Sequence, residues 1–200
     1  KVDPKRPITV TEMINNDDGT ISYQTKTEKN QKEVWLQTDI IEGNHDEWSW
    51  KLIGHHIARA LAIRLAPYMR YLGPMVGSVV VDGIFHKLIH PEGGLSSTLS
   101  NIVEKHLKYV RESEESEGLP TIVRLGHYHI ELILYDERVG ELVACIKAPD
   151  QFLQTHALLP SIGMSIMEVY LDKEGKKITR IISEYRDYYP LYLKLKKEQV

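Results

Sequence analysis

The chain has 200 residues, of which 42% are hydrophobic and 26% are charged, and its formal net charge at pH 7 is −3. This composition suits one globular domain and excludes a largely disordered chain, while the weak net charge confines any nucleic-acid site to a local basic patch. The single cysteine, Cys145, excludes an intramolecular disulfide and favours an intracellular, cytoplasmic location. The longest apolar-leaning run, residues 53–72, is interrupted by histidines and arginines, so we expect no membrane anchor.

Residues 1–46 are predicted to form antiparallel strands at the N-terminal end of the fold. Between residues 8 and 41, β-branched and aromatic residues alternate with polar ones on both sides of a turn at residues 16–19. We therefore expect an N-terminal β-hairpin extension ahead of a core at residues 47–184, within a single domain that spans residues 1–200.

Two stretches in the middle of the chain have apolar residues at helical spacing. A helix is predicted to begin at Trp48, with an apolar stripe made of Ile53, Ile57, Ala60, Leu61 and Leu65. Residues 73–89 have features of both strand and helix, because three consecutive valines favour a strand whereas the spacing of Val76, Val80 and Phe85 suits a helix. We predict a helix for this stretch.

The second half of the chain alternates between helical and strand patterns. A helix capped by Ser96 or Ser97 is predicted, and its apolar face consists of Leu99, Val103, Leu107 and Val110. Further predictions are a strand hairpin at residues 121–148 with its turn at 137–140, a short helix at 151–162, and a strand pair at 166–171 and 178–184. This order favours an α/β fold with a mixed central β-sheet flanked by helices. A tyrosine- and lysine-rich tail follows at residues 185–200.

The predicted hairpin brings several reactive side chains together. Alternate residues of a strand share a face, so His129 and Glu131 lie on one face of the first arm, and Cys145 and Lys147 on one face of the second. With the turn centred near residue 138, Glu131 pairs with Cys145 and His129 with Lys147, about 5 Å apart at Cβ. A slip of one residue in this register would scatter the set onto opposite faces.

These residues resemble the core of the PD-(D/E)XK nuclease superfamily, in its RecB-like and Holliday-junction-resolvase-like branch. In that core, a glycine precedes an acid on one strand, and an acid-x-lysine motif follows on the next strand. Gly126 and Glu131 fall on the first pair of positions, and Cys145 and Lys147 fall on the second. The resemblance implies a restriction-endonuclease-like core with Glu131 as a metal ligand and Lys147 as the catalytic lysine.

The resemblance also implies site residues outside the hairpin. RecB-like relatives carry a histidine on a preceding helix, to which His55 or His56 corresponds as an auxiliary metal ligand. They often carry a catalytic glutamine on the helix after the lysine, where Gln151 or Gln154 lies.

Cys145 stands where the family places its second metal-binding carboxylate. Phosphodiester hydrolysis needs a divalent cation, and Mg²⁺ prefers carboxylate oxygens to a thiol. Three outcomes remain open. The second acid comes from another position; the site binds manganese or zinc through Cys145 and His129; or the fold is kept without cleavage. The candidate acids for the first outcome are Glu141, Asp150 and Glu168.

The function expected from these motifs is a metal-dependent nuclease that uses Mg or Mn to hydrolyse phosphodiester bonds in DNA. In the tail, tyrosines interleaved with basic residues suit contacts with nucleic acid or a homodimer interface. The candidate nucleic-acid-binding residues are Arg186, Tyr188, Lys194 and Lys196. One alternative is a catalytically inactive nuclease-fold module that binds nucleic acid or protein. Another is a zinc-stabilised domain that uses His127 or His129 with Cys145.

Structural roles alone also account for several of these residues. Glu131 and Lys147 could form a cross-strand ion pair on a half-exposed sheet, and Cys145 could be a small buried hydrophobic residue. His55 and His56 lie beside an apolar stripe, where a hydrogen-bonded structural histidine is as reasonable as a metal ligand.

Overall fold

The computed structural model describes residues 9–15, 21–27, 37–94, 98–149, 153, 155 and 159–198. The chain divides into two compact units, Lys1–Gln37 and Thr38–Val200. In the first unit, β1 (Thr9–Asn15) and β2 (Ile21–Thr27) pair antiparallel, as predicted for an N-terminal hairpin. The turn at residues 16–19 lies outside the described residues, and a single domain over the whole chain stays a prediction.

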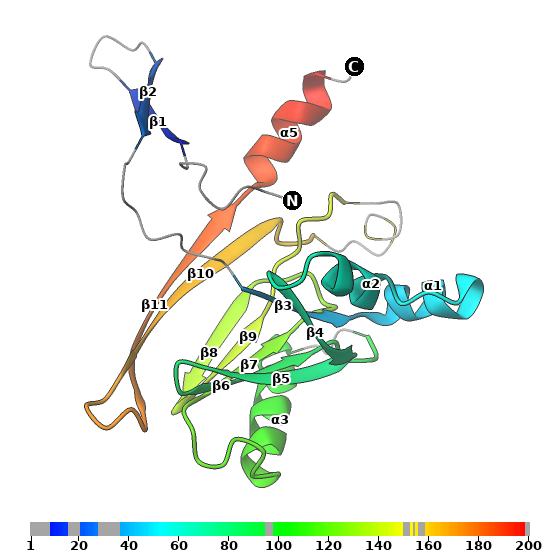
Figure 1. The fold of residues 1–200 in the computed structure, drawn as a ribbon, viewed down its shortest axis with the longest axis vertical. Coiled ribbons are helices and arrows are strands. Elements are labelled where there is room, and N and C mark those ends of the chain that lie inside the picture. Colours follow the sequence, from blue (N-terminus) through cyan, green and yellow to red (C-terminus); the bar gives the residue numbers. More distant parts are fainter. Residues whose placement is uncertain are drawn as a thin grey trace. The chain divides into compact units, whose positions relative to one another are not determined.

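The second unit is built on a mixed sheet of five strands in the order β5-β6-β7-β9-β8 (Figure 1). The strands are β5 (Val76–Val81), β6 (Ile84–Ile89), β7 (Thr121–Leu125), β8 (Leu132–Asp136) and β9 (Arg138–Leu142). The three central strands, β6, β7 and β9, run parallel, and β5 and β8 join them antiparallel at the two edges. The predicted α/β fold with a mixed central sheet and flanking helices is confirmed.

Helix α3 (Leu99–Glu112) covers one face of this sheet. It connects β6 to β7, since two parallel neighbours need a crossover between them. Its buried side chains pack on apolar residues of the sheet that include Phe85, Val123, Leu125 and Leu142. The predicted apolar face is confirmed at Val103, Leu107 and Val110, all of which are buried. The helix begins after Thr98, and the predicted caps Ser96 and Ser97 lie outside the described residues.

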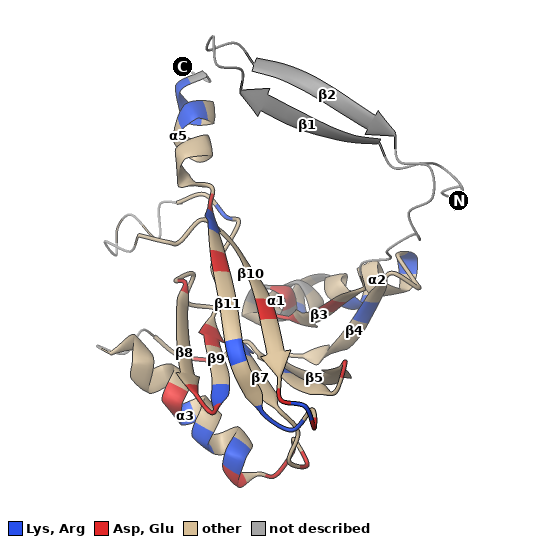
Figure 2. Ribbon diagram, turned by 90° about the vertical axis from the view of Figure 1, so that its left-hand side faces the viewer, with Lys and Arg blue, Asp and Glu red and all other residues tan. Residues whose placement is uncertain are grey.

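The hairpin of β10 (Gly163–Leu171) and β11 (Ile178–Asp187) covers the opposite face of the sheet (Figure 2). Side chains of β10 alternate between exposed and half-buried positions, so every second residue points to the sheet. Val169 and Ile181 pack there against Ile122 and Val139. The predicted strand pair at 166–171 and 178–184 is confirmed, and α5 (Tyr189–Glu198) follows it.

A second, parallel strand pair adjoins the central sheet. It consists of β3 (Thr38–Glu42) and β4 (Met69–Pro74), which are connected by α1 (Asn44–Ile53) and α2 (Ile57–Arg64). The prediction of antiparallel strands as far as residue 41 is therefore wrong for β3, because the two helices form a crossover that returns the chain parallel to it. The backbone N–H of Met75 donates to the Glu42 carbonyl at 3.1 Å, and the His90 N–H donates to the Met75 carbonyl at 2.7 Å. These two bonds hold the carboxyl end of β3 beside the carboxyl end of β6.

The prediction of one helix through residues 48–65 is wrong, because the chain forms two helices there. Gly54 has φ 71° and caps the end of α1 with a hydrogen bond from its N–H to the Trp50 carbonyl. Glycine adopts this left-handed conformation without the steric cost that a Cβ would add. The apolar spacing continues across the break, so periodicity alone could not locate it.

The prediction of a helix at residues 73–89 is also wrong. These residues form the end of β4 and the antiparallel pair β5 and β6, in which Val81 lies opposite Ile84. Asp82 and Gly83 between them both have positive φ, 49° and 78°. That conformation is typical of an Asp-Gly type I′ turn, which joins two strands directly and favours the hairpin over the helix.

The hairpin predicted at residues 121–148 exists only in its central part. β8 and β9 turn at Glu137, with Asp136 opposite Arg138 and Leu132 opposite Leu142, so the predicted register is wrong by two residues. The first arm is also interrupted, because β7 pairs parallel to β9 on the side away from β8. Among the described residues, no helix is both long and apolar enough to cross a membrane.

Replacement of Gly140 tests the close packing of α3 on β9. A Cβ at this position would lie 3.0 Å from Leu107 Cδ1 and nearer still to Val103 Cγ1. We expect Gly140→Ala to lower the free energy of unfolding in denaturant titrations by about 1–3 kcal/mol, because it overpacks a closed core.

The matched control is Gly94→Ala, since a Cβ there meets open space and the change should stay within about 0.5 kcal/mol. Combining Gly140→Ala with Val103→Ala should cost less than the sum of the single changes, because it removes the colliding methyl group. Strictly additive costs would contradict the direct contact.

Candidate functional site

Two carboxylates lie at the carboxyl end of β9. Glu141 belongs to β9 and is paired with Ile133, while Glu131 directly precedes β8. Extending the β8–β9 register by one residue would place Glu131 opposite Val143, on the face that Glu141 occupies and diagonal to it. The two acidic side chains are therefore neighbours on the face that β10 and β11 cover.

The electrostatics of Glu131 reflect this closeness. Burial, followed by the negative charge of Glu141, raises the pKa of the Glu131 carboxyl above its usual range. Glu141 itself is only 3% exposed. A partly desolvated acid whose ionisation is disfavoured by a neighbouring carboxylate is a common feature of catalytic and cation-binding sites.

A row of polar side chains crosses the sheet from Glu141. The Arg124 guanidinium donates from Nε to Glu141 Oε2 at 2.9 Å and lies 2.8 Å through Nη1 from His86 Nδ1. Burial, and then the positive charge of Arg124, lowers the pKa of His86 to about 4, although Asp39 acts in the opposite direction. His86 is therefore neutral near pH 7, and its Nδ1 accepts the hydrogen bond from Arg124.

The segment before β10 holds the loop that carries Glu131. The Glu131 N–H donates to Ser161 Oγ at 3.0 Å, and the Ser161 N–H donates to the His129 carbonyl at 2.8 Å. On its other side this segment bonds to Cys145, whose N–H donates to the Ser161 carbonyl at 3.0 Å. Glu131 and Cys145 are thus fixed on the two sides of Ser161.

Tyr185 of β11 completes the surroundings of Glu131. Burial, and then the negative charge of Asp187, raises the pKa of the Tyr185 hydroxyl, and Glu131 and Cys145 act on it in the same direction. A phenol with a raised pKa remains protonated near neutral pH and is a hydrogen-bond donor. The β10–β11 hairpin therefore places the neutral hydroxyl of Tyr185 close enough to Glu131 for the two groups to interact electrostatically.

The predicted pairs Glu131 with Cys145 and His129 with Lys147 are wrong. β9 ends at Leu142, and Cys145 pairs instead with Ile162 in an isolated parallel bridge. The Cys145 thiol donates to the Lys147 carbonyl at 3.5 Å, and the Lys147 side chain is exposed. The pairs do not form because segment 159–163 lies between the two arms. Ser161 bonds to His129 on one side and to Cys145 on the other, so the two arms cannot bond to each other there.

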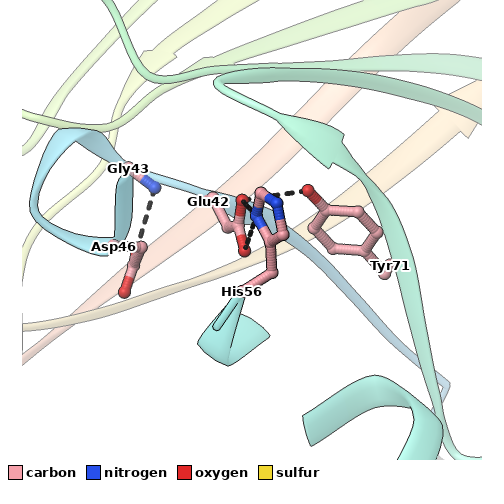
Figure 3. A network of polar contacts seen from close by, with 5 residues as sticks. All are labelled: Glu42, Gly43, Asp46, His56 and Tyr71. Carbon is pink, nitrogen blue, oxygen red and sulfur yellow. Dashed lines mark hydrogen bonds and ion pairs between the residues drawn. The ribbon is translucent and has the colours of Figure 1, made fainter. Parts of the chain in front are cut away.

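His56 belongs to a polar network at the carboxyl end of β3 (Figure 3). Its Nδ1 lies 2.9 Å from Oε2 of Glu42, which is 2% exposed, and the Tyr71 hydroxyl donates to the same oxygen at 3.0 Å. Burial, and then the bond to Glu42, raises the pKa of Tyr71 to about 12. A histidine held by a carboxylate through Nδ1 has the arrangement of many metal-binding histidines. The neighbouring His55 is exposed.

The remaining predicted residues lie at separate places. Gln154, like Gln151 and Asp150, is outside the described residues. His129 is half-buried with φ 58°. In the tail, Arg186 donates from Nη2 to Glu184 at 3.0 Å. Its side chain is exposed, and so are those of Tyr188, Lys194 and Lys196.

The sequence reasoning missed Arg124 and His86, and it named Glu141 only as one candidate among three. Each of the two missed residues is a polar residue in a strand that is mostly apolar, which is a signal that the sequence carries. A buried charge needs a partner, so Arg124 and Glu141 on adjacent strands could have been paired on that ground.

In the described part of the chain, no group of three or more His, Cys, Asp or Glu side chains is arranged to hold a metal ion. Magnesium is commonly bound through one or two carboxylates, with water and substrate phosphates as further ligands. The pair of Glu131 and Glu141 fits this second kind of site.

Replacing Glu131 should stabilise the fold at neutral pH. The folded state raises the pKa of this carboxyl, so ionisation costs stability above the raised pKa and costs nothing below the pKa of the unfolded chain. We expect Glu131→Gln to increase the free energy of unfolding at pH 7 and to lose this gain as the pH falls toward 4. Glu104→Gln, on the exposed surface of α3, is the control in the same denaturant titrations. A destabilised Glu131→Gln protein at pH 7 would contradict the assignment.

The lowered pKa of His86 leads us to expect a second pH dependence of the fold's stability, with the opposite sign. Its pKa of about 4 lies below the usual 6.5, so the unfolded chain takes up the proton first and stability falls as the pH drops from 6.5 to 4. His86→Asn retains an acceptor for Arg124 without a titrating ring, and its unfolding free energy should depend less on pH in that window. If the unfolding free energies of the two proteins depend on pH in the same way in urea titrations, His86 is not held neutral in the folded state. His55→Asn is the exposed control.

No protein-family model matches this chain, and no curated protein or solved structure matches it either. Its function must therefore be inferred from the chemistry of its own residues.

Proposed function

We propose that this protein is a metal-dependent nuclease in which Glu131 and Glu141 bind Mg²⁺ or Mn²⁺ for the hydrolysis of phosphodiester bonds in DNA. The observation that supports it is the closeness of the two carboxylates, since the charge of Glu141 raises the pKa of Glu131. A divalent cation between such carboxylates would relieve their repulsion. Glu141 would then supply the acid that the PD-(D/E)XK resemblance expects at Cys145.

The residues around the pair have roles that suit this reaction. A bound divalent cation would supply a more acidic attacking water and neutralise phosphate charge. Arg124 holds Glu141 in position through Nε and adds positive charge on the same side of the sheet. Tyr185 is a neutral donor near Glu131, and Lys147 remains the proposed catalytic lysine on an exposed segment just beyond β9.

Helix α5 supports DNA as the substrate. Its basic residues Lys194, Lys196 and Lys197 are exposed and gather toward its C-terminal end (Figure 2). The rings of Tyr189 and Tyr192 lie 5.8 Å apart on the same helix. Lysines and aromatic rings together suit phosphate contacts and base stacking. The exposed leucines of α5, Leu191, Leu193 and Leu195, also suit a homodimer.

A cleavage assay with matched carboxamide variants tests the proposal. Purified protein is incubated with single-stranded, double-stranded and branched DNA in the presence of Mg²⁺ or Mn²⁺, and products are resolved on gels. We expect cleavage by the native protein and a loss of at least about a hundredfold in Glu131→Gln and in Glu141→Gln, because each removes a direct cation ligand. Glu104→Gln, which keeps both acids, should cleave at the native rate.

Two other results would decide against this function. Absence of cleavage with every substrate and both metals, together with salt-sensitive DNA binding, would favour the inactive nuclease-fold module. Cleavage that survives in both carboxamide variants would place the active centre elsewhere on the chain.

A further inference from the structure

Two imidazole rings meet at the carboxyl ends of β6 and β7, whereas the two carboxylates described above lie at the carboxyl end of β9. His90 directly follows β6, and His127 lies two residues after β7; because these strands are parallel neighbours, both histidines lie at the same edge of the sheet. His127 Nδ1 is 3.1 Å from His90 Nε2, and the rings are nearly perpendicular, at 76°. Both rings are half-buried, so small solutes can reach them.

Asn44 contributes a third donor atom to the same point. It is the first residue of α1, and its Oδ1 lies 2.9 Å from His90 Nε2. Three segments that are far apart in the sequence therefore direct two nitrogens and one amide oxygen at one small volume. Because the third donor is an amide, this set differs from a cluster of histidine, cysteine and acidic side chains.

The tautomer of His127 is assigned by its second hydrogen bond. Its Nε2 lies 2.9 Å from the Gly93 carbonyl oxygen, which can only accept, so Nε2 carries the hydrogen. In the neutral ring, Nδ1 then carries a lone pair that faces His90. Metal-binding histidines usually donate their other ring N–H to a carbonyl or carboxylate in this way.

The backbone around the pair is shaped to keep the rings in place. His127 has φ 76°, a conformation that residues other than glycine rarely adopt, and such strain tends to be retained at functional sites. Gly43 leaves room for the His90 ring, since a Cβ at Gly43 would lie 2.7 Å from His90 Cε1. The positions of both rings are thus fixed by backbone and not only by their mutual contact.

We propose that His90 Nε2, His127 Nδ1 and Asn44 Oδ1 form a binding site for Zn²⁺ or a similar divalent first-row metal ion that prefers imidazole. Ligand atoms about 2.1 Å from one ion, at angles of 90–110°, are about 3.0–3.4 Å apart, which agrees with the 3.1 Å between the two nitrogens. The ion takes the place of the proton shared by the rings, and water fills its open position. Imidazole ligands favour zinc, cobalt and nickel over magnesium.

The test is metal binding to the full chain, measured by calorimetry with Zn²⁺ and by the visible absorption of bound Co²⁺. The native protein should bind one equivalent at this site. His90→Gln and His127→Gln should each weaken binding at least tenfold, and Asn44→Ala should weaken it less, because an amide is the poorest of the three ligands. Binding should also weaken at acidic pH, where protons compete for the imidazole nitrogens.

Three controls separate this site from metal binding elsewhere on the chain. His106→Gln, on α3, changes a histidine outside the site and should leave the affinity unchanged. The double variant Glu131→Gln, Glu141→Gln should also leave the affinity for Zn²⁺ and Co²⁺ unchanged. This result distinguishes a failure of the nuclease proposal from a failure of the histidine site. Cys145→Ser should have no effect; a loss of affinity there would assign the ion to a thiol site instead.

The proposal is overturned if the native, His90→Gln and His127→Gln proteins bind Co²⁺ or Zn²⁺ with equal affinity. It is also overturned if the native protein binds neither ion stoichiometrically. In that case the contact between the rings is a hydrogen bond alone. Far-UV circular dichroism verifies the fold of each variant. Should His90→Gln fail to fold, the affinity of His127→Gln decides the outcome.

Discussion

The parallel alignment of β6, β7 and β9 is the constraint on which the rest of this structure depends. Parallel strands need a crossover, and α3 supplies the one between β6 and β7. The same helix packs Val103 and Leu107 against Gly140 of β9. The carboxyl ends of all three strands consequently lie at one edge of the sheet, the place where open α/β sheets usually bind ligands. Both candidate sites are found along this edge.

Buried charges in this chain are held by partners from other elements. Glu42 bonds to His56 and Tyr71, Glu141 bonds to Arg124, and Lys87 bonds to Glu115. Desolvating an ionised group is costly, so a shift that separated any of these partners would leave a charge alone. For Glu141 with Arg124 and for Glu42 with Tyr71, the partners lie on neighbouring parallel strands, and these contacts favour the observed strand register. Glu131 differs from these residues, since its principal electrostatic neighbour is another carboxylate. A destabilising group of this kind is expected where function, and not stability, has selected it.

The loop between β7 and β8 connects the two candidate sites. It begins near His127, which faces His90, and ends at Glu131, which neighbours Glu141. Its backbone has positive φ at both His127 and His129, and hydrogen bonds from Ser161 and to Ser161 hold its second half. Contacts with other segments thus hold the loop near both ends, with an imidazole at its start and a carboxylate at its end. The imidazole donors then suit ions such as zinc, and the carboxylate donors suit magnesium or manganese.

The sequence by itself determined the elements whose patterns are local. The apolar stripe of α3, the alternation in β10 and β11, and the strand character of the N-terminal hairpin all depend on residues close in the chain. The same local signals led to errors at residues 73–89 and at Gly54. There a dipeptide turn and a left-handed glycine end the regular patterns, and their effect depends on one or two backbone angles.

Only the tertiary structure decided which reactive residues meet. Glu131 was found from the sequence, but its partner is Glu141 and not Cys145, because the β8–β9 register differs by two residues from the predicted one and segment 159–163 pairs with Cys145. His90, Asn44 and His127 are brought together by three strands and a crossover, with long stretches of chain between them. Strand pairing between distant segments is set by the packing of the whole sheet, and no local pattern encodes it.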